Sequence, residues 1–201
     1  MPGPSSGGTA SAALTARSPG SAGATQVIHG CTIVAKPSRK NHTKCPGANL
    51  SGLGVHLAGV DLSYADLSHA NLSDAILPVA NLRGADLSYA KLTNATLLGV
   101  DMSHADLANA SASGAVLYRA DLEGANLTNT GLWNANLTSA NLSNSDLAYA
   151  DLPYANLTRA DLSDADLLGA NLTNADMTRV VLCHTYMPDH SLRHPGCRPR
   201  R

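Results

Sequence analysis

Apolar and small residues recur along this chain with a period of five. From Leu57 to Leu182 every fifth residue is Leu, apart from Met102, Ala112 and Met177. The residue two positions before each of these centres is small, most often Ala, and the residue one position before is usually Asp or Asn. A helix repeats its buried face every 3.6 residues and a strand every second residue. The period predicts neither, and the polar residues between the centres favour turns.

Two inward positions in every five residues, one bulky and one small, predict a narrow coil whose wall turns at each repeat. Four such turns would close a coil, and stacked coils would bury Leu on Leu and Ala on Ala. At the spacing of neighbouring strands, about 4.8 Å per coil, the regular segment predicts a rod roughly 30 Å long. Each coil of a solenoid contacts only its neighbours, so both ends need caps. A further copy, ANLSG at residues 48–52, lies out of this register.

Composition divides the chain into four segments. Residues 1–26 are rich in Pro, Gly, Ser and Ala and are predicted to be disordered. Residues 27–54 form an N-terminal lead-in or cap, residues 55–184 the repeat solenoid, and residues 185–201 a C-terminal Cys loop with a basic tail. The chain has no Phe and only 3% aromatic residues, fewer than an ordinary packed core of this size contains. No apolar run is long enough to span a membrane.

The repeats resemble those of the pentapeptide-repeat family, whose motif is A(D/N)LXX, for example in ANLTSANLSNSDLAYADLPYANLTRADLSDADLLGANL at residues 135–172. The resemblance covers residues 55–184. It implies an all-β fold, a right-handed quadrilateral β-helix with the central Leu and the preceding Ala inside. The two Cys-containing ends resemble those of secreted bacterial members. The family hosts unrelated functions, so the fold by itself does not assign one.

Residues twenty apart are expected to stack on one face of such a coil, and this sorting separates the charges. Two neighbouring faces are acidic in the position before the centre. One contains Asp61, Asp101, Asp121 and Asp161, and the next contains Asp66, Asp86, Asp106, Asp146 and Asp166. In one interpretation these side chains supply local turn hydrogen bonds. In the other they are the working surface of a DNA mimic.

A DNA mimic that acts on a type II topoisomerase (gyrase) is the alternative function that the acidic faces suggest. The resemblance supplies this alternative, because the fluoroquinolone-resistance branch of the family acts in this way. That branch favours Phe at many centres, and this chain contains no Phe. The basic tail of the present chain contains too few arginines to indicate nucleic acid as a partner.

Another face carries apolar residues at its outward positions in the early coils and polar or basic ones, such as Arg159 and Arg179, in the later coils. The apolar candidates for a partner face are Ile76, Val79, Leu98, Val116 and Tyr118. A contiguous apolar area on a polar rod has two interpretations. Either the N-terminal segment covers it, or a protein partner binds there.

The four cysteines lie outside the regular repeats as the pairs Cys31/Cys45 and Cys183/Cys197. Their even number and short spacing predict one disulfide bond at each end of the rod. The alternative at the C-terminal end is a zinc site, although no CXXC or HXXXH spacing occurs there. Its ligands would come from Cys183, His184, His190, His194 and Cys197.

Paired cysteines favour an extracytoplasmic location, where disulfides persist. The chain as given contains no apolar signal-peptide core. These two indications conflict, unless the chain begins at a different residue or the cysteines stay reduced inside the cell.

Nothing in the chain indicates catalysis. No nucleophile and base, phosphate-binding loop or isolated pair of carboxylates stands apart from the repeat. The net charge of −1 combines an acidic repeat region with basic flanks. We therefore expect a non-enzymatic structural or protein-binding rod without a cofactor, whose protein partner the sequence does not identify.

Overall fold

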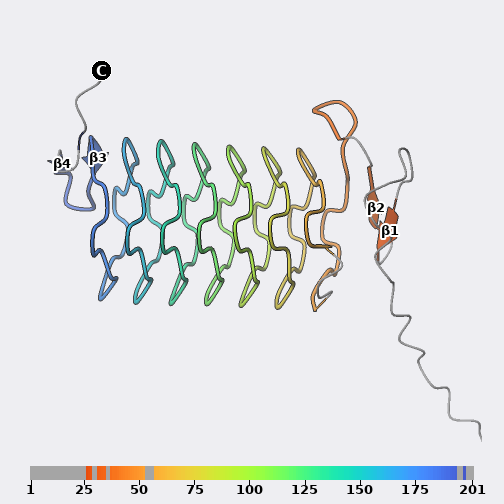
Figure 1. The fold of residues 1–201 in the computed structure, drawn as a ribbon, viewed down its shortest axis with the longest axis horizontal. Coiled ribbons are helices and arrows are strands. Elements are labelled where there is room, and N and C mark those ends of the chain that lie inside the picture. Colours follow the sequence, from red (N-terminus) through yellow and green to blue (C-terminus); the bar gives the residue numbers. More distant parts are fainter. Residues whose placement is uncertain (1–25, 29–30, 35–36, 53–56, 194–196, 198–201) are drawn as a thin grey trace, which may run out of the picture.

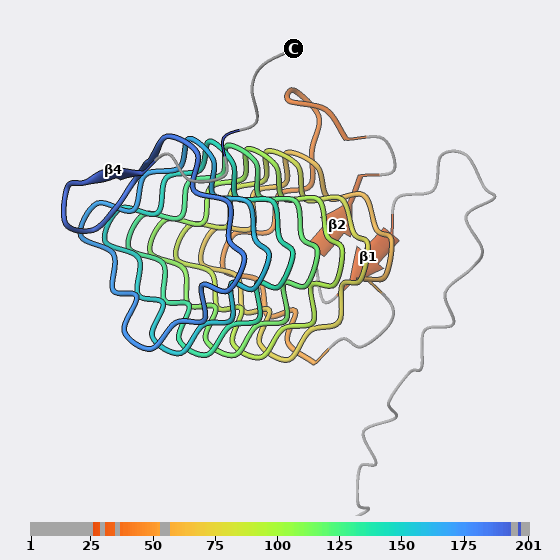
Figure 2. The ribbon, with the colours of Figure 1, turned by 60° about the vertical axis from the view of Figure 1, so that its left-hand side comes forward.

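The computed structural model describes residues 26–28, 31–34, 37–52, 57–193 and 197. Stacked coils form a rod, with the lead-in at one end and the C-terminal loop at the other (Figure 1). A view turned by 60° shows the walls of successive coils lying over one another (Figure 2). The segment predicted to be disordered lies, up to residue 25, outside the described residues, as does the end of the basic tail.

Four short strands lie at the two ends. At the N-terminal end, β1 (Gln26–Ile28) pairs antiparallel with β2 (Cys31–Ile33). At the C-terminal end, β3 (Thr185–Tyr186) pairs antiparallel with β4 (Leu192–Arg193). The coils between them are joined by single parallel bridges. In the part of the chain that the structure describes, no helix has the length and apolarity needed to cross a membrane.

The parallel bridges show that one regular coil contains twenty residues. Asp61 pairs with Asn81, and the same spacing recurs along all four columns of bridges. The N–H of Leu62 donates to the C=O of Asn81 at 2.7 Å, and the N–H of Asn81 donates to the C=O of Val60 at 2.8 Å. The N–H of Ala65 donates to the C=O of Leu62 at 3.0 Å and closes the turn. Each five-residue repeat therefore supplies one short piece of wall and one turn.

Four columns of bridges, which we call faces, run along the rod, with a turn, which we call a corner, between one column and the next. We number the faces by the columns that begin at Asp61 (face one), Asp66 (face two), Asn71 (face three) and Ile76 (face four). Every corner residue that precedes a small inward residue, from position 59 to position 184, has a positive φ. Gly, Asn and Asp adopt this left-handed conformation at low cost. The corners also contain Val79, a β-branched residue, at φ 50°.

The core is a ladder of Leu and small residues, as the period predicts. The centres from Leu57 to Leu167 are all buried, and so are the small residues before them from Ala65 onward. Polar residues enter this ladder only where a carbonyl receives them. Thr130 occupies an Ala position, and its buried hydroxyl donates to the C=O of Leu107 at 2.7 Å.

The Asp and Asn residues before the centres complete the hydrogen bonding of the wall. In residues 57–182 each of them except Asp151 accepts a hydrogen bond from the backbone N–H two residues further on. Asp151 is followed by Pro153, which has no N–H, and its Oδ1 accepts from Asn171 Nδ2 at 2.8 Å instead. These side chains therefore form the local turn bonds that the first interpretation predicts.

At the N-terminal end the ladder continues beyond Val55, the first residue of the regular sequence pattern. Asn49 pairs with Asn71, two residues further apart than in the regular coils. Cys45 and Leu50 are buried as additional rungs. The ANLSG copy, which is out of register in the sequence, therefore stacks with the repeats in space.

At the C-terminal end the last rungs are less well covered. Leu172, Met177 and Leu182 are only partly buried, whereas the centres of the preceding coil are buried almost completely. The centres near the end belong to the ladder as predicted, but within the described residues nothing fully covers their outer side.

Ala112 replaces Leu at one buried rung of face three. The backbone ladder continues through this rung, since the N–H of Ala112 donates to the C=O of Gly131 at 2.7 Å. We expect Ala112→Leu to raise the free energy of unfolding by about 1–3 kcal/mol, since removing a buried Leu usually costs about 2–5 kcal/mol and insertion adds some strain. Urea denaturation measures the change. A loss of stability would mean that neighbours such as Met102, on the opposite face of the same coil, already fill the space.

Candidate functional site

The outward side chains of face four in the early coils form the apolar patch, defined as Ile76, Val79, Leu98, Val116 and Tyr118. Val79 and Leu98 have exposed fractions of 65% and 42%, and the other three are partly buried. The described part of the lead-in lies at the end of the rod (Figure 1). The interpretation in which residues 1–25 cover the patch falls outside the described residues.

Val79 combines exposure with backbone strain. A β-branched residue in the left-handed region is a genuine outlier and costs of order 1–3 kcal/mol. The side chain contributes nothing to the core, since it projects into solvent and lies against Gly99, whose added Cβ would be 3.5 Å from Val79 Cγ1. Folding does not require valine at this corner, and strained residues of this kind cluster at functional sites.

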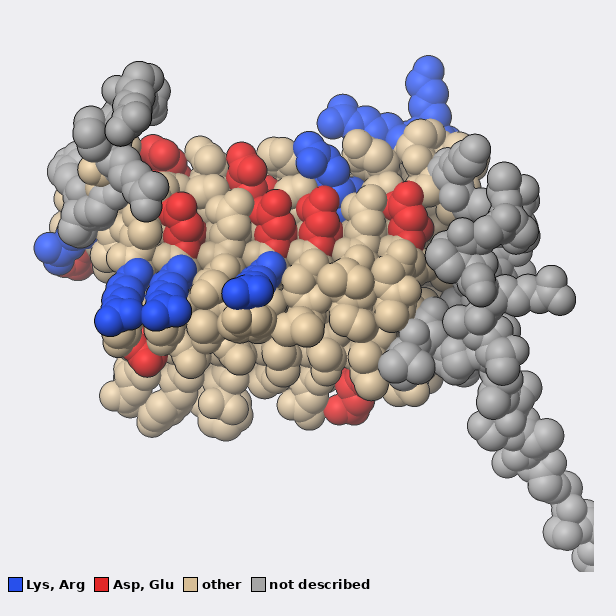
Figure 3. Space-filling model, in the orientation of Figure 1, with Lys and Arg blue, Asp and Glu red and all other residues tan. Residues whose placement is uncertain are grey.

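Arginines continue the corner of Val79 toward the C-terminal end. Arg119, Arg159 and Arg179 occupy this corner in later coils, and we call them the arginine row. The guanidinium of Arg119 lies 5.1 Å from the ring centroid of Tyr118. Figure 3 shows the blue row directly beneath a row of red carboxylates and in line with an uncharged area in the N-terminal half of the rod. The apolar patch therefore has a basic extension along the rod.

The two acidic columns differ in their surroundings. On face one the column of Asp61, Asp101, Asp121 and Asp161 borders the arginine row (Figure 3). The arginines reduce the net negative charge along this edge of the rod. On face two the bridges stack Asp66, Asp86 and Asp106 one above another. Asn residues interrupt both columns and relieve repulsion between the coils: Asn126 Nδ2 donates to Asp106 Oδ1 and Asn141 Nδ2 to Asp121 Oδ1, both at 3.0 Å.

Two carboxylates near the C-terminal end are stabilised in their ionised form. Hydrogen bonds from the side chain and the backbone of Thr178 lower the pKa of Asp176, and the hydroxyl of Thr158 donates to its Oδ2 at 3.2 Å. Hydrogen bonds from Ser191 lower the pKa of Asp189 in the same way. Asp176 lies on face four, and so the late coils of this face keep an acidic group among the arginines over a wide pH range.

Both predicted cysteine pairs are disulfide bonds. Cys31 bonds to Cys45 beside β2, and Cys183 bonds to Cys197 at the end of the last coil. The ligand atoms of Cys183, His184 and Cys197 lie within 4.8 Å of one another. With the disulfide formed, neither sulfur is the thiolate that zinc binds. The zinc ligands suggested by the sequence are therefore only partly brought together: His190 lies apart from this group, and His194 lies outside the described residues.

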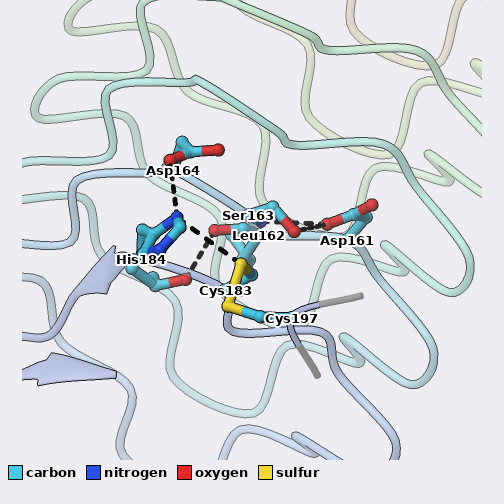
Figure 4. Close-up of a disulfide and its surroundings, with 8 residues drawn as sticks. Asp161, Leu162, Ser163, Asp164, Cys183, His184 and Cys197 are labelled. Atoms are coloured by element: carbon cyan, nitrogen blue, oxygen red, sulfur yellow. Dashed lines mark hydrogen bonds and ion pairs between the residues drawn. A yellow bond between two sulfur atoms is a disulfide. The ribbon is translucent and has the colours of Figure 1, made fainter. Parts of the chain in front are cut away.

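An acidic neighbour of this cluster was not foreseen from the sequence. Asp164 Oδ1 lies 3.3 Å from His184 Nδ1, which is also 3.5 Å from Cys183 Sγ (Figure 4). Asp164 and His184 are twenty residues apart and share a corner, so the coil length could have identified them. A smaller apolar area was also missed, where the rings of Trp133 and Tyr154 meet edge to face with centroids 6.4 Å apart.

A scan against protein families matches this chain to the model described as pentapeptide repeats. The match comprises eight copies and covers residues 41–78, 80–117, 115–148 and 140–179. The comparison with curated proteins found no match.

Several solved structures are similar to this chain. A pentapeptide repeat protein from the thylakoid lumen of Arabidopsis thaliana is 27% identical, with 47% of this chain and 66% of that chain covered and a TM-score of 0.46. HetL from the cyanobacterium Nostoc sp. strain PCC 7120, described as involved in heterocyst differentiation regulation, is 30% identical, with 75% and 87% covered and a TM-score of 0.31. QnrB1, a plasmid-mediated fluoroquinolone resistance protein, is 20% identical, with 68% and 78% covered and a TM-score of 0.35.

Proposed function

This chain belongs to the pentapeptide-repeat family, and we propose that it is a non-enzymatic rod that binds a protein partner through the apolar patch on face four. A stacked β-helix with a continuous backbone ladder holds its surface side chains in fixed columns, which suits it to present a binding surface. The right-handed, quadrilateral form of the coil that the family resemblance implies is part of this proposal. The observation that carries it is Val79, which is both strained and the most exposed of the large apolar side chains in the described residues.

Burial of apolar area favours face four over the acidic faces. Removing apolar surface from water contributes about 25 cal/mol per Å². An exposed charge pair contributes roughly 0–1 kcal/mol and is screened by salt. The carboxylates on faces one and two also already accept the turn bonds of the wall, so part of their hydrogen-bonding capacity is used within the fold.

The arginine row indicates how a partner segment would be oriented and which residue types it would contain. A segment that lays apolar side chains on the patch would continue along the corner past Arg119 toward Arg159. We therefore propose a partner segment with apolar residues followed by acidic ones. Charge pairing at this edge fixes the orientation and speeds association more than it adds affinity.

We expect Val79→Asn to weaken partner binding while it stabilises the fold. Asn tolerates the left-handed region better than Val, and relief of the strain is expected to raise the free energy of unfolding by about 1 kcal/mol. A gain in stability together with a loss of binding cannot result from unfolding. Urea denaturation gives the first quantity. The second comes from quantitative pull-downs from the source cells, with Tyr149→Asp, an exposed corner variant on another face, as the matched control.

A protein captured by the wild type and by Tyr149→Asp, but at least tenfold less by Val79→Asn and Val116→Asp, supports the proposal. If every captured protein binds all four forms equally, face four is not the binding surface.

Removing residues 1–25 tests the interpretation in which the N-terminal segment covers the patch, because the described lead-in stays intact. A dye that fluoresces on apolar surfaces would bind the shortened chain much more strongly than the full chain if the segment covered the patch.

The acidic faces remain the basis of the alternative, a DNA mimic acting on a type II topoisomerase. Face two favours it more than face one, because Asp66, Asp86 and Asp106 stack without an arginine row beside them. A supercoiling assay separates the two functions. Inhibition of gyrase that is lost in the Asp86→Asn, Asp106→Asn double variant and unchanged in Val79→Asn would replace the apolar patch by face two as the working surface.

A further inference from the structure

A pocket of about 390 Å³ lies where the lead-in meets face one. In the described part of the chain its lining consists of Arg39, His42, Tyr64, Arg83, Gly84 and His104, which we call the basic pocket. Two of these residues come from the lead-in, and four come from the first coils. Lys and Arg side chains gather at the upper edge of the rod at this end (Figure 3). The sequence pattern does not bring these residues together, because the lead-in lies outside the regular repeat.

The two guanidinium groups of the basic pocket are not neutralised by the protein. Among the described residues the only ion pair joins His184 to Asp164, far from this end. The guanidinium of Arg39 lies 5.7 Å from the ring centroid of Tyr64 and so rests on an aromatic face instead of a carboxylate. Arg83 follows Asn81, a neutral residue in the column, whose Oδ1 accepts the Arg83 backbone N–H. Neither guanidinium group therefore has a carboxylate at ion-pair distance among the described residues.

The carboxylates of face one in these coils accept turn bonds through one oxygen. Asp61 Oδ1 accepts the N–H of Ser63 at 3.1 Å. Asp101 Oδ1 accepts both the N–H of Ser103 at 2.9 Å and its hydroxyl at 2.7 Å. These contacts hold the side chains in the wall and leave the arginine side chains without a direct acidic partner.

The backbone fixes the two residues that the lead-in contributes. Ser38 and Asn41 exchange two backbone hydrogen bonds, so Arg39 lies in the tip of a tight hairpin. Thr43 C=O accepts the N–H of Asp66 at 2.8 Å, which anchors His42 next to the first coils. The Cys31–Cys45 disulfide ties the same segment to β2. A site built on a pre-ordered backbone loses less entropy on binding a ligand.

His42 has an unused polar atom. Its Nδ1 is buried and has no hydrogen-bond partner among the described residues. Such an atom costs about 1–3 kcal/mol, and native proteins contain few of them, so each one calls for an explanation, a bound water or ion among them. At the other side of the pocket, Gly84 at φ +61° leaves open the space beside Tyr64: a Cβ there would lie 2.9 Å from the Tyr64 ring.

We propose that the basic pocket binds a small phosphomonoester. Two guanidinium groups and two imidazoles from different chain segments line one pocket, groups that suit the oxygens of a tetrahedral dianion, and the fork of arginine pairs with phosphate in a bidentate manner. The volume lies in the range of small-molecule sites. It exceeds the needs of a bare phosphate ion, so an organic body has room beside the ring of Tyr64. The proposal is independent of the apolar patch, which lies on another face.

The test is isothermal titration of the full-length, disulfide-bonded protein with phenyl phosphate, inorganic phosphate and benzoate. We expect saturable binding of one phenyl phosphate per chain and at least tenfold weaker binding in Arg83→Gln and in Arg39→Gln. Arg193→Gln, which removes a charge of the same kind from β4 at the other end of the rod, is the matched control and is expected to leave the dissociation constant unchanged. Because Arg83 is exposed, its replacement is not expected to unfold the rod.

A second variant separates the pocket from general electrostatic attraction. Gly84→Ala keeps every charge but places a Cβ against the Tyr64 ring, so it is expected to weaken binding at least fivefold while circular dichroism shows a folded chain. Phenyl phosphate that binds at least fivefold more tightly than inorganic phosphate identifies an ester, whereas equal affinities identify the free ion as the ligand. Absence of saturable binding, equal affinity in Arg83→Gln and Arg193→Gln, or tighter binding of benzoate than of phenyl phosphate would overturn the proposal.

Discussion

Leu142→Ala is expected to lower the free energy of unfolding by about 3–5 kcal/mol, whereas Leu182→Ala is expected to lower it by about 1 kcal/mol or less. The two residues occupy the same column of face one, and the chemical change is identical. Leu142 is completely buried, with covering coils on both sides, so its removal leaves a cavity that the stiff ladder cannot close. Leu182 is only partly buried in the last coil. Urea denaturation of both variants measures the difference.

Equal losses for the two variants would contradict the exposed C-terminal end. They would mean that Leu182 is covered in solution, and sedimentation analysis would then show whether a second copy of the chain covers it. Leu162→Ala is a further control, because Leu162 lies in the same column one coil before Leu182. Since Leu162 is also completely buried, its loss is expected to match that of Leu142.

Loss of the disulfides is expected to have the second largest effect, about 3 kcal/mol for each bridge. Each bridge closes a loop of 14 residues in sequence separation, and the loop-entropy model gives about this value for such a loop. We expect the Cys31–Cys45 bridge to contribute more than the Cys183–Cys197 bridge, because Cys45 is also a buried rung of the first coil. Denaturation with and without a reductant measures the sum.

Double serine variants separate the two bridges. Cys31→Ser with Cys45→Ser and Cys183→Ser with Cys197→Ser should each remove one part of the response to reductant, and the four-serine variant should show none. Intact mass should rise by two hydrogens per bridge on reduction. Four free thiols in protein made under oxidising conditions would contradict the bridges, and zinc bound at one ion per chain would restore the alternative at the C-terminal end.

The Asp and Asn columns show how one position can serve two interpretations. The charge pattern alone suggests an acidic binding surface, while the structure gives nearly every one of these side chains a turn hydrogen bond. Where Pro153 removes the N–H, the oxygen of Asp151 bonds to Asn171 in the next coil. Face two still presents a run of carboxylates to solvent, so the turn bonds account for residue type without excluding a surface role.

The sequence by itself determined the register of the rod, because the inward positions depend only on a local five-residue pattern. A Leu centre and a small residue two positions before it must point inward in every repeat, and the coil length then assigns each side chain to a column. The coil length also put the candidate residues of the apolar patch in one column, and the even number and short spacing of the cysteines predicted both disulfide pairs.

Only the tertiary structure decided what happens where the period is broken. The two-residue shift before Leu57 brings Leu50 into the ladder, and the docking of the lead-in places Arg39 and His42 beside Arg83 and His104. The strain of Val79 likewise depends on the sign of its φ at a corner, which residue type alone would not indicate. The positions of Leu50, Arg39 and His42 arise from contacts between segments distant along the chain, which a local pattern does not encode. The strain of Val79 arises because the repeating corner gives every residue at this position a positive φ.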